Sequence, residues 1–387
     1  MFKNKISTIV SKVKNVVKNK SKNLHEPLFK GNEIKYLNEC IRSTFVSSSG
    51  KFVELFEKKI AKYTKSKNAV AVINGTSAIH ILLKSLDVKF NDEVIVPSLT
   101  FVATANAVKY CGAHPNFVDV TEKNLGICPK KLKIYLDQIA IVKKNYSINR
   151  NNGRKIKALI AVHVFGVPCE IIEIKKVCKK FNIKVIEDAA EALGSFFKNK
   201  HLGNFSEGGV ISFNGNKTIT AGNGGVIITN SNLLAKKIKH LSTTAKVKSE
   251  WEYDHDEVGY NYRLSNINAA IGCAQIENIK NILIAKKRNY HMYLKQFKNV
   301  IFVEIMKEPE NSSINHWLIR LKIKKKLVKK NSLLRALHKS KIKSRPVWKP
   351  LNTLKIFKNC QSDNCNTSKK IYETVINLPS SPEISYK

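Results

Sequence analysis

The stretch GVISFNGNKTITAGNGGVII, residues 209–228, decides how we expect this chain to fold. An apolar run leads into it and another leads out. The residues between them are mostly small, polar or glycine, which is typical of strand, loop and strand. Lys217 lies in that loop, and a lysine held between buried strands can lose its charge through desolvation and attack a carbonyl carbon, as a Schiff base requires. The alternative is a solvated surface lysine, which the flanking apolar runs disfavour.

Outward from this stretch the chain alternates between helical and strand patterns. We expect helices at residues 33–43, 53–63, 78–86, 104–110 and 169–181, and strands at residues 68–73, 93–97, 115–120, 156–165 and 184–187. Strands separated by helices predict an α/β fold with a parallel or mostly parallel sheet covered on both faces.

The same pattern predicts how the chain is divided. Long helical segments occupy residues 267–297, and alternation resumes near residue 300. We expect a basic N-terminal arm, a large domain and a smaller C-terminal domain at residues 1–24, 25–275 and 276–387. The polar stretch 145–155 lacks periodicity and is predicted to be an exposed loop.

Composition restricts the class of protein. The chain has 387 residues and 43% of them are hydrophobic, which is typical of a globular protein. No apolar run reaches the roughly 18 residues of a membrane span, and lysines interrupt the N-terminus where a secretion signal would need an apolar core. We therefore expect a cytoplasmic protein. The eight cysteines are scattered without a C-x-x-C pair, so neither a metal site nor a redox motif is predicted, and buried reduced thiols are expected.

The formal net charge of +39 could indicate a nucleic-acid-binding protein. Only eight of the 68 basic residues are arginine, however, and arginine is the residue that reads bases through bidentate contacts. Abundant lysine, asparagine and isoleucine are what an AT-rich coding sequence favours. We therefore do not expect a nucleic-acid partner, although a basic surface would attract an anionic substrate.

Residues 1–22 have valine and isoleucine at helical spacing with lysines between them, which predicts a basic amphipathic helix. Such a helix could lie on an anionic membrane, so that the protein would be peripheral at the inner membrane face. It could instead pack on the body of the protein or on a partner subunit. The β-branched apolar face, with one aromatic residue, favours packing.

Polar residues follow several predicted strands, where the carboxyl ends of parallel strands form ligand sites. The run N-G-T-S-A at 74–78 could bind an anion through Gly75, Thr76, Ser77 and the start of a helix, or could be an ordinary helix cap. Asp188 follows a buried strand and could hold a proton on a ring nitrogen, or could also be a cap.

Two further groups complete the set. Ser212 precedes the Lys217 loop, and the run G-Y-N-Y-R at 259–263 opens a helical segment that could contribute to a phosphate site or be a loop with two packed tyrosines. An anion site, a buried carboxylate and a Schiff-base lysine are together what pyridoxal phosphate requires.

The combination of motifs resembles the DegT/DnrJ/StrS-type nucleotide-sugar aminotransferases over about residues 25–380. The motifs that carry the resemblance are N-G-T-S-A (74–78), P-S-L-T-F-V-A-T-A-N-A (97–107), V-H-V-F-G (162–166), E-D-A-A-E (187–191), S-F-N-G-N-K (212–217), G-N-G-G (222–225) and G-Y-N-Y-R (259–263). The further stretches W-E-Y-D-H-D-E (251–257), N-H-W-L (315–318) and R-P-V-W (345–348) look most like the branch that acts on UDP-4-keto-6-deoxy-N-acetylhexosamines in bacillosamine and legionaminic acid synthesis.

The resemblance implies a fold-type I aminotransferase, with a mixed, mostly parallel sheet flanked by helices in a large cofactor-binding domain and a smaller C-terminal α/β domain. It implies that Lys217 binds pyridoxal 5'-phosphate covalently and that Asp188 pairs with its ring nitrogen. Further cofactor contacts are implied for Gly75, Thr76, Ser77, Phe101, Glu191 and Ser212, and for Asn261 of a neighbouring subunit in a homodimer. His163 and Arg345 lie in family motifs and are candidate substrate residues.

The implied reaction moves an amino group from L-glutamate to the 4-keto carbon of a UDP-sugar, for surface glycan biosynthesis. A branch of the family that carries histidine in place of the lysine performs a dehydration instead, and Lys217 argues against that branch. The competing hypothesis is a basic, membrane- or nucleic-acid-associated protein on a catalytically inactive aminotransferase fold.

Overall fold

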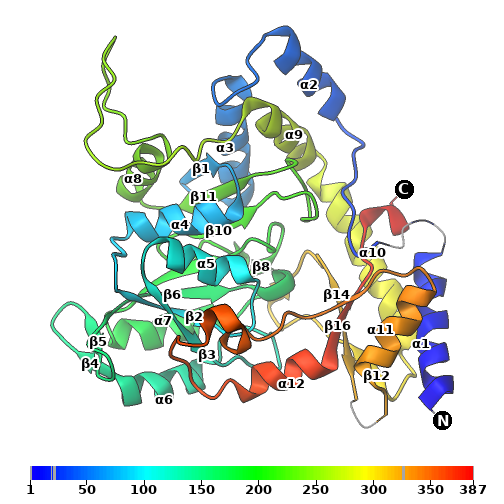
Figure 1. Cartoon of the computed structure of the whole chain (residues 1–387). Helices are drawn as coiled ribbons and strands as arrows, with labels where there is room; N and C mark the ends of the chain where they lie inside the picture. The colour runs from blue at the N-terminus through cyan, green and yellow to red at the C-terminus, as the bar shows by residue number, and fades with distance from the viewer. Residues whose placement is uncertain (1, 19, 21–22, 325–326, 387) are drawn as a thin grey trace.

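A computed structural model describes residues 2–18, 20, 23–324 and 327–386. Residues 1, 19, 21 and 22 of the predicted arm, and residues 325, 326 and 387 of the predicted C-terminal domain, lie outside the described part. Within it, nine strands form one large sheet (Figure 1), whose main path runs β1-β11-β10-β7-β6-β2-β3. These strands are β1 (Asn68–Val72), β2 (Glu93–Pro97), β3 (His114–Val118), β6 (Lys155–Val162), β7 (Lys184–Asp188), β10 (Gly209–Ser212) and β11 (Gly225–Thr229).

The sheet is mixed but mostly parallel, as the sequence predicted. The strands β10, β7, β6, β2 and β3 pair in parallel, whereas β11 pairs antiparallel with both β10 and β1. The loop that carries Lys217 therefore connects two neighbouring antiparallel strands, β10 and β11. Residue 212 is opposite residue 225 in that pairing, so the long connection begins and ends at the same edge of the sheet.

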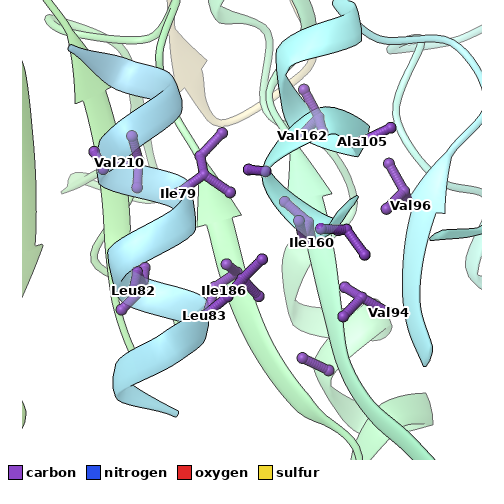
Figure 2. Close-up of a cluster of buried hydrophobic side chains, with 14 of the residues drawn as sticks. Ile79, Leu82, Leu83, Val94, Val96, Ala105, Ile160, Val162, Ile186 and Val210 are labelled. Atoms are coloured by element: carbon purple, nitrogen blue, oxygen red, sulfur yellow. The ribbon is translucent and has the colours of Figure 1, made fainter. Parts of the chain in front are cut away.

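Helices cover both faces of this sheet because its strands bury side chains on alternating sides. Val94 and Val96 pack on one face with α4 (Gly75–Ser85) and α5 (Val102–Tyr110), as Figure 2 shows. Residues of α8 (Asn232–Ser242) belong to the same cluster. Ile95 between them packs on the other face. The helices of that other face are α2 (Glu33–Arg42), α3 (Lys51–Thr64), α6 (Pro129–Ile139), α7 (Ile171–Lys180) and α9 (Asn266–Glu277).

The C-terminal part of the chain forms a second, four-stranded sheet in the order β12-β14-β16-β15. Its strands are β12 (Val303–Ile305), β14 (Ile319–Ile323), β15 (Arg345–Pro346) and β16 (Val375–Leu378), and its neighbouring helices are α10 (Ile279–Phe297), α11 (Lys330–Lys339) and α12 (Asn366–Thr374). A small three-stranded sheet links the two parts, because β13 (Ser312–Ser313) pairs with β8 (Phe196–Phe197), which pairs with β9 (Lys200–His201). Short 3-10 turns are at Val164–Gly166, Leu351–Thr353, Lys355–Phe357 and Pro382–Ile384.

The predicted N-terminal helix forms α1 (Phe2–Val17), and it packs on the body of the protein beside α10 and α11 (Figure 1). Ile9, Val13 and Val16 are at most 1% exposed and join the core of the C-terminal part. The exposed side of α1 carries mostly serine, threonine and asparagine, with Lys14. Its apolar face is therefore buried in the protein, so the interpretation as a packed arm explains that face better than membrane contact does.

The polar stretch 145–155 was predicted to be an exposed loop, and this prediction is wrong in part. It contains β5 (Ser147–Asn149), which pairs with β4 (Ala140–Val142) and with β6 at the edge of the large sheet. Asn149 is fully buried and donates a 2.8 Å hydrogen bond to the buried carboxylate of Glu93. The polar composition concealed this strand because its side chains are buried by hydrogen bonding rather than by apolar packing.

None of the helices in the described part of the chain is both long and apolar enough to cross a bilayer. All eight cysteines lie in that part and are free thiols, six of them buried, as predicted.

Candidate active site

A pocket of about 320 Å³ opens where the carboxyl ends of β1, β2, β6, β7 and β10 meet. This is the edge at which ligands bind in open α/β sheets. The predicted site residues that line it are Gly75, Thr76, Phe101, His163, Asp188, Glu191, Ser212 and Lys217.

Lys217 faces the interior of this pocket, and only 14% of its side chain is exposed. Its Nζ lies 3.3 Å from Glu191 Oε1 and 4.2 Å from the centre of the Trp317 ring. The loop turns tightly here, because the Lys217 N–H donates to the Asn214 carbonyl over 2.9 Å. The interpretation as a solvated surface charge is therefore wrong.

Glu191 is buried next to this amine. One oxygen faces Lys217 Nζ and the other accepts a 2.8 Å hydrogen bond from the Phe165 N–H. Burial raises the pKa of Glu191, while the charge of Lys217 and the Phe165 N–H act in the opposite direction. A carboxyl group so placed can accept a hydrogen bond from an amine or share a proton with it.

Asp188 ends β7 and is 6% exposed. The Thr104 hydroxyl donates to its Oδ2 over 2.8 Å and the Ala190 N–H donates to its Oδ1 over 3.1 Å. Burial raises the pKa of Asp188, and these two hydrogen bonds and the charge of Lys217 oppose that rise. A turn follows Asp188 rather than a helix, so its interpretation as a helix cap is wrong.

The start of α4 forms a cradle suited to an anion. A Cβ at Gly75 would lie 3.1 Å from Ser212 Cβ, so the absence of a side chain keeps the space between α4 and β10 open. The first N–H groups of a helix have no partner inside it, and those of Gly75 and Thr76 are at the pocket lining. Asn74 is the actual cap, because its side chain accepts from the Ser77 N–H over 2.8 Å.

His163 also lines the pocket, but its Nε2 is already paired with Glu187. Its Nε2 lies 2.9 Å from Glu187 Oε2, and both side chains are fully buried. Burial alone would lower the pKa of His163, but Cys169 and the Glu187 carboxylate outweigh burial and raise it. The backbone N–H of His163 donates to the Asp188 carbonyl over 3.0 Å, so His163 also holds the end of the strand that carries Asp188.

Three predicted residues do not line the pocket. The Ser77 side chain is absent from its lining, and its N–H is used in the cap of α4. Asn261 is exposed, and its Oδ1 accepts from Arg263 Nε over 3.0 Å. Arg345 begins β15 and is also exposed. The run at 259–263 precedes the α9 helix rather than opening it, since Ser265 is the helix cap.

Sequence reasoning assigned Phe101 to the site but missed the other residues of its aromatic wall, Phe165, Trp317 and Trp348, and the residue behind Asp188. Trp348 stacks on Phe165 with ring centres 4.6 Å apart. The Trp317 ring centre lies 6.1 Å from that of Phe165, and the Phe101 ring centre lies 6.3 Å from that of Trp348. A signal was present, because two of the three tryptophans of the chain lie in the stretches N-H-W-L and R-P-V-W. Thr104 carried no signal of its own, because its partner Asp188 is 84 residues away.

The residues present fit pyridoxal phosphate. Lys217 offers an amine for the aldehyde, Asp188 a carboxylate for the ring nitrogen, and the glycine-lined start of α4 a cradle for the phosphate. Phe101 and the tryptophans offer flat surfaces for an aromatic ring.

The chain belongs to the DegT/DnrJ/EryC1/StrS aminotransferase family, whose sequence profile matches residues 27–387. It is therefore a sugar aminotransferase that depends on pyridoxal phosphate, as the motifs predicted.

Individual relatives resemble most of the chain. The chain is 35% identical to the GDP-perosamine synthase of Vibrio cholerae over 361 residues, covering 93% of this chain and 94% of the relative. It is 31% identical to the UDP-4-amino-4,6-dideoxy-N-acetyl-beta-L-altrosamine transaminase of Campylobacter jejuni over 346 residues, covering 88% of each chain. Among solved structures, Helicobacter pylori PseC, an aminotransferase involved in the biosynthesis of pseudoaminic acid, matches with a TM-score of 0.83 and 25% identity, covering 93% of this chain and 94% of that one.

These relatives confirm the family but not the predicted branch. A relative named for a GDP-sugar is more similar to this chain than one named for a UDP-sugar. The expectation of a UDP-4-keto-6-deoxy-N-acetylhexosamine substrate is therefore a proposal.

Proposed function

We propose that this protein transfers an amino group from L-glutamate to the 4-keto carbon of a nucleotide-linked 4-keto-6-deoxy sugar. One observation carries the proposal: Lys217, Glu191 and Asp188 line a single pocket, next to an anion cradle. When bound there, pyridoxal phosphate would supply an electron sink for the substrate carbon that loses or gains a proton.

The residues of the chain have separate tasks. Lys217 lines the pocket and would hold the cofactor through its amine, and the same amine, once free, could move a proton to and from the substrate carbon. Glu191, 3.3 Å away, accepts a hydrogen bond from that amine and orients it. Asp188 would pair with the ring nitrogen of the cofactor and keep it protonated, because the carboxylate is buried. Gly75, Thr76 and Ser212 would hold its phosphate.

The aromatic wall would limit access of water to the reacting atoms. Trp348, Phe165 and Trp317 form a continuous set of rings beside Lys217. Removal of water strengthens the electrostatic contacts of Asp188 and Glu191, because those contacts are weaker in a high dielectric.

For the sugar, we propose a UDP-4-keto-6-deoxy-N-acetylhexosamine, on the basis of the stretches at 251–257, 315–318 and 345–348. A GDP-linked 4-keto-6-deoxy sugar is the second candidate, favoured by the 35% identity with a GDP-perosamine synthase. Candidate contacts to the sugar are His163 at the pocket and Arg345 outside it. We propose that the aminated sugar is used in surface glycan biosynthesis.

We also propose that the working form is a homodimer in which Asn261 completes the phosphate site of the neighbouring subunit. Asn261 is exposed and outside the pocket of its own chain, so such a contact requires a second copy. The adjoining segment 246–258 extends away from the body beside α8 (Figure 1) and leaves Trp251, Tyr253 and Val258 at least 79% exposed. Apolar side chains so exposed are expected to be covered in an assembly.

The test is a panel of substrates. Enzyme converted to its pyridoxamine form with L-glutamate is offered UDP-, GDP- and dTDP-linked 4-keto-6-deoxy sugars, and the products are identified by mass. We expect the UDP-linked N-acetylhexosamine to be aminated fastest and Lys217→Ala to form no product. Faster amination of the GDP-linked sugar would replace the substrate proposal, and no amination of any sugar would contradict the proposed function.

A further inference from the structure

The segment Asn315–Trp317, between β13 and β14, crosses from the C-terminal part to the Lys217 loop and holds that loop on both sides. Trp317 Nε1 donates a 2.7 Å hydrogen bond to the carbonyl of Asn216. Asn315 Nδ2 donates a 3.0 Å hydrogen bond to the hydroxyl of Thr218. These two contacts are on the residues directly before and directly after Lys217.

The same two side chains also set what surrounds the amine. The Trp317 ring centre lies 4.2 Å from Lys217 Nζ, at which distance a cation is attracted to the ring face. Asn315 Nδ2 lies 2.8 Å from the Glu191 carbonyl, so Asn315 contacts both the Lys217 loop and the backbone of the carboxylate that faces Lys217. Asn315 and Trp317 are therefore among the residues that contact both the Lys217 loop and the surroundings of its amine.

The segment is itself rigidly braced. Asn315 and Trp317 are 1% and 4% exposed, and Asn315 Oδ1 accepts from the Trp317 N–H over 2.9 Å. His316 between them has a φ of 47° and stacks on Tyr290 of α10 with ring centres 4.1 Å apart. The buried Lys286 amine of the same helix donates to the Trp317 carbonyl over 3.3 Å.

We propose that Asn315 and Trp317 are positioning residues that orient the Lys217 amine toward the reacting carbon and cover one side of it. The proposal rests on the proposed role of Lys217. In this proposal the N-H-W-L stretch holds Asn216 and Thr218, so that the Lys217 side chain between them keeps one direction. A side chain fixed in this way needs little reorganisation before it reacts.

The experiment uses the full chain without cofactor. Each lysine is labelled in trace amounts with acetic anhydride, and the label on every lysine peptide is measured by mass spectrometry. Trp317→Leu removes both the ring and the indole N–H, Trp317→Phe keeps a ring but loses the N–H, and Asn315→Ala removes the other hydrogen bond. Phe90→Leu is the control, because that aromatic ring is 83% exposed and does not line the pocket.

We expect Trp317→Leu to raise labelling of Lys217 by about two- to fivefold relative to the other lysines, as loss of a cation–ring contact predicts. Trp317→Phe and Asn315→Ala should give smaller rises, and Phe90→Leu none. In the loaded enzyme, Trp317→Phe should lower kcat with glutamate while KM stays within about twofold, as expected for an interaction that matters in the transition state.

Unchanged labelling of Lys217 in folded Trp317→Leu and Asn315→Ala protein would overturn the proposal. So would an equal rise at all lysines, because that indicates general loosening of the fold. Failure of the proposed function gives a different result: wild-type protein would then take up no cofactor at Lys217, whatever the labelling pattern of the variants.

Discussion

Thr104→Val should move the acid limb of the pH–rate profile to higher pH. The Thr104 hydroxyl donates a 2.8 Å hydrogen bond to Asp188 Oδ2, and the Thr104 residue is 1% exposed. Valine has nearly the same shape but cannot donate, so the change removes this hydrogen bond and the 3.1 Å contact between the Thr104 and Thr100 hydroxyls. Because burial already raises the pKa of Asp188, losing a contact that opposes the rise should raise it further.

The size of the shift follows from the strength of the lost contact. A hydrogen bond to a charged group contributes about 1.5–3 kcal/mol, and 1.36 kcal/mol corresponds to about one pKa unit. The carboxylate of Asp188 should therefore be lost about one to two pH units higher in the variant than in the wild type. Activity that needs the ionised form should decline at correspondingly higher pH.

The assay is the rate of the half-reaction with glutamate between pH 5 and 8, followed by the change in cofactor absorbance. Thr100→Val is the matched control, because the Thr100 hydroxyl lies 3.1 Å from Thr104 Oγ1 and no hydrogen bond links it to Asp188. We expect a smaller displacement of the acid limb in the control. An acid limb that coincides with that of the wild type in folded Thr104→Val would refute the assignment of Asp188 as the group that must be ionised.

Three further predictions concern other parts of the molecule. Ile9→Ala should lower the free energy of unfolding, measured by urea denaturation, by about 2–5 kcal/mol, because Ile9 is buried. Ser7→Ala, on the exposed side of α1, should change it by less than about 0.5 kcal/mol, and equal effects would contradict the packing of α1. Burial lowers the pKa of His201 to about 4, so between about pH 6.5 and 4 the unfolded state binds a proton that the folded state does not. This difference should lower the free energy of unfolding by about 2 kcal/mol at pH 5 relative to pH 7. His201→Asn should abolish that part of the pH dependence, and an unchanged pH dependence would contradict the assignment to His201. Gly225→Ala would put a Cβ 2.4 Å from the Asn74 carbonyl oxygen, so it should destabilise the protein by about 1–3 kcal/mol in the same urea assay, and a neutral effect would show that the cradle can widen.

Much of the fold could be predicted because the buried strands have an apolar run between turn residues. The strands on both sides of the Lys217 loop are such runs, and both form in the structure. The strand Ser147–Asn149 could not be predicted, because its two buried side chains are polar, and the partner of Asn149, Glu93, is more than 50 residues away. Periodicity detects apolar burial but not burial by hydrogen bonding.

Some residues of the candidate site could likewise be predicted from the sequence and others could not. Lys217 and Asp188 could be predicted because Asp188 ends a buried strand, Lys217 lies in the loop that follows another, and the ends of parallel strands meet at one edge. Trp317 and Asn315 come from the C-terminal part of the chain, and nothing local to them indicates that they contact the Lys217 loop. That contact depends on how the two parts pack, which a single sequence does not encode in any short pattern.

The central claim is that Lys217, and no other lysine, is covalently bound to pyridoxal phosphate in the resting enzyme. The direct measurement is borohydride reduction of the purified yellow protein, followed by digestion and mass analysis of every lysine peptide. We predict that the peptide carrying Lys217 gains the mass of the reduced cofactor and that the Lys217→Ala variant gains it nowhere. A cofactor locked onto a different lysine, or a wild-type protein that carries none after incubation with pyridoxal phosphate, would contradict the account.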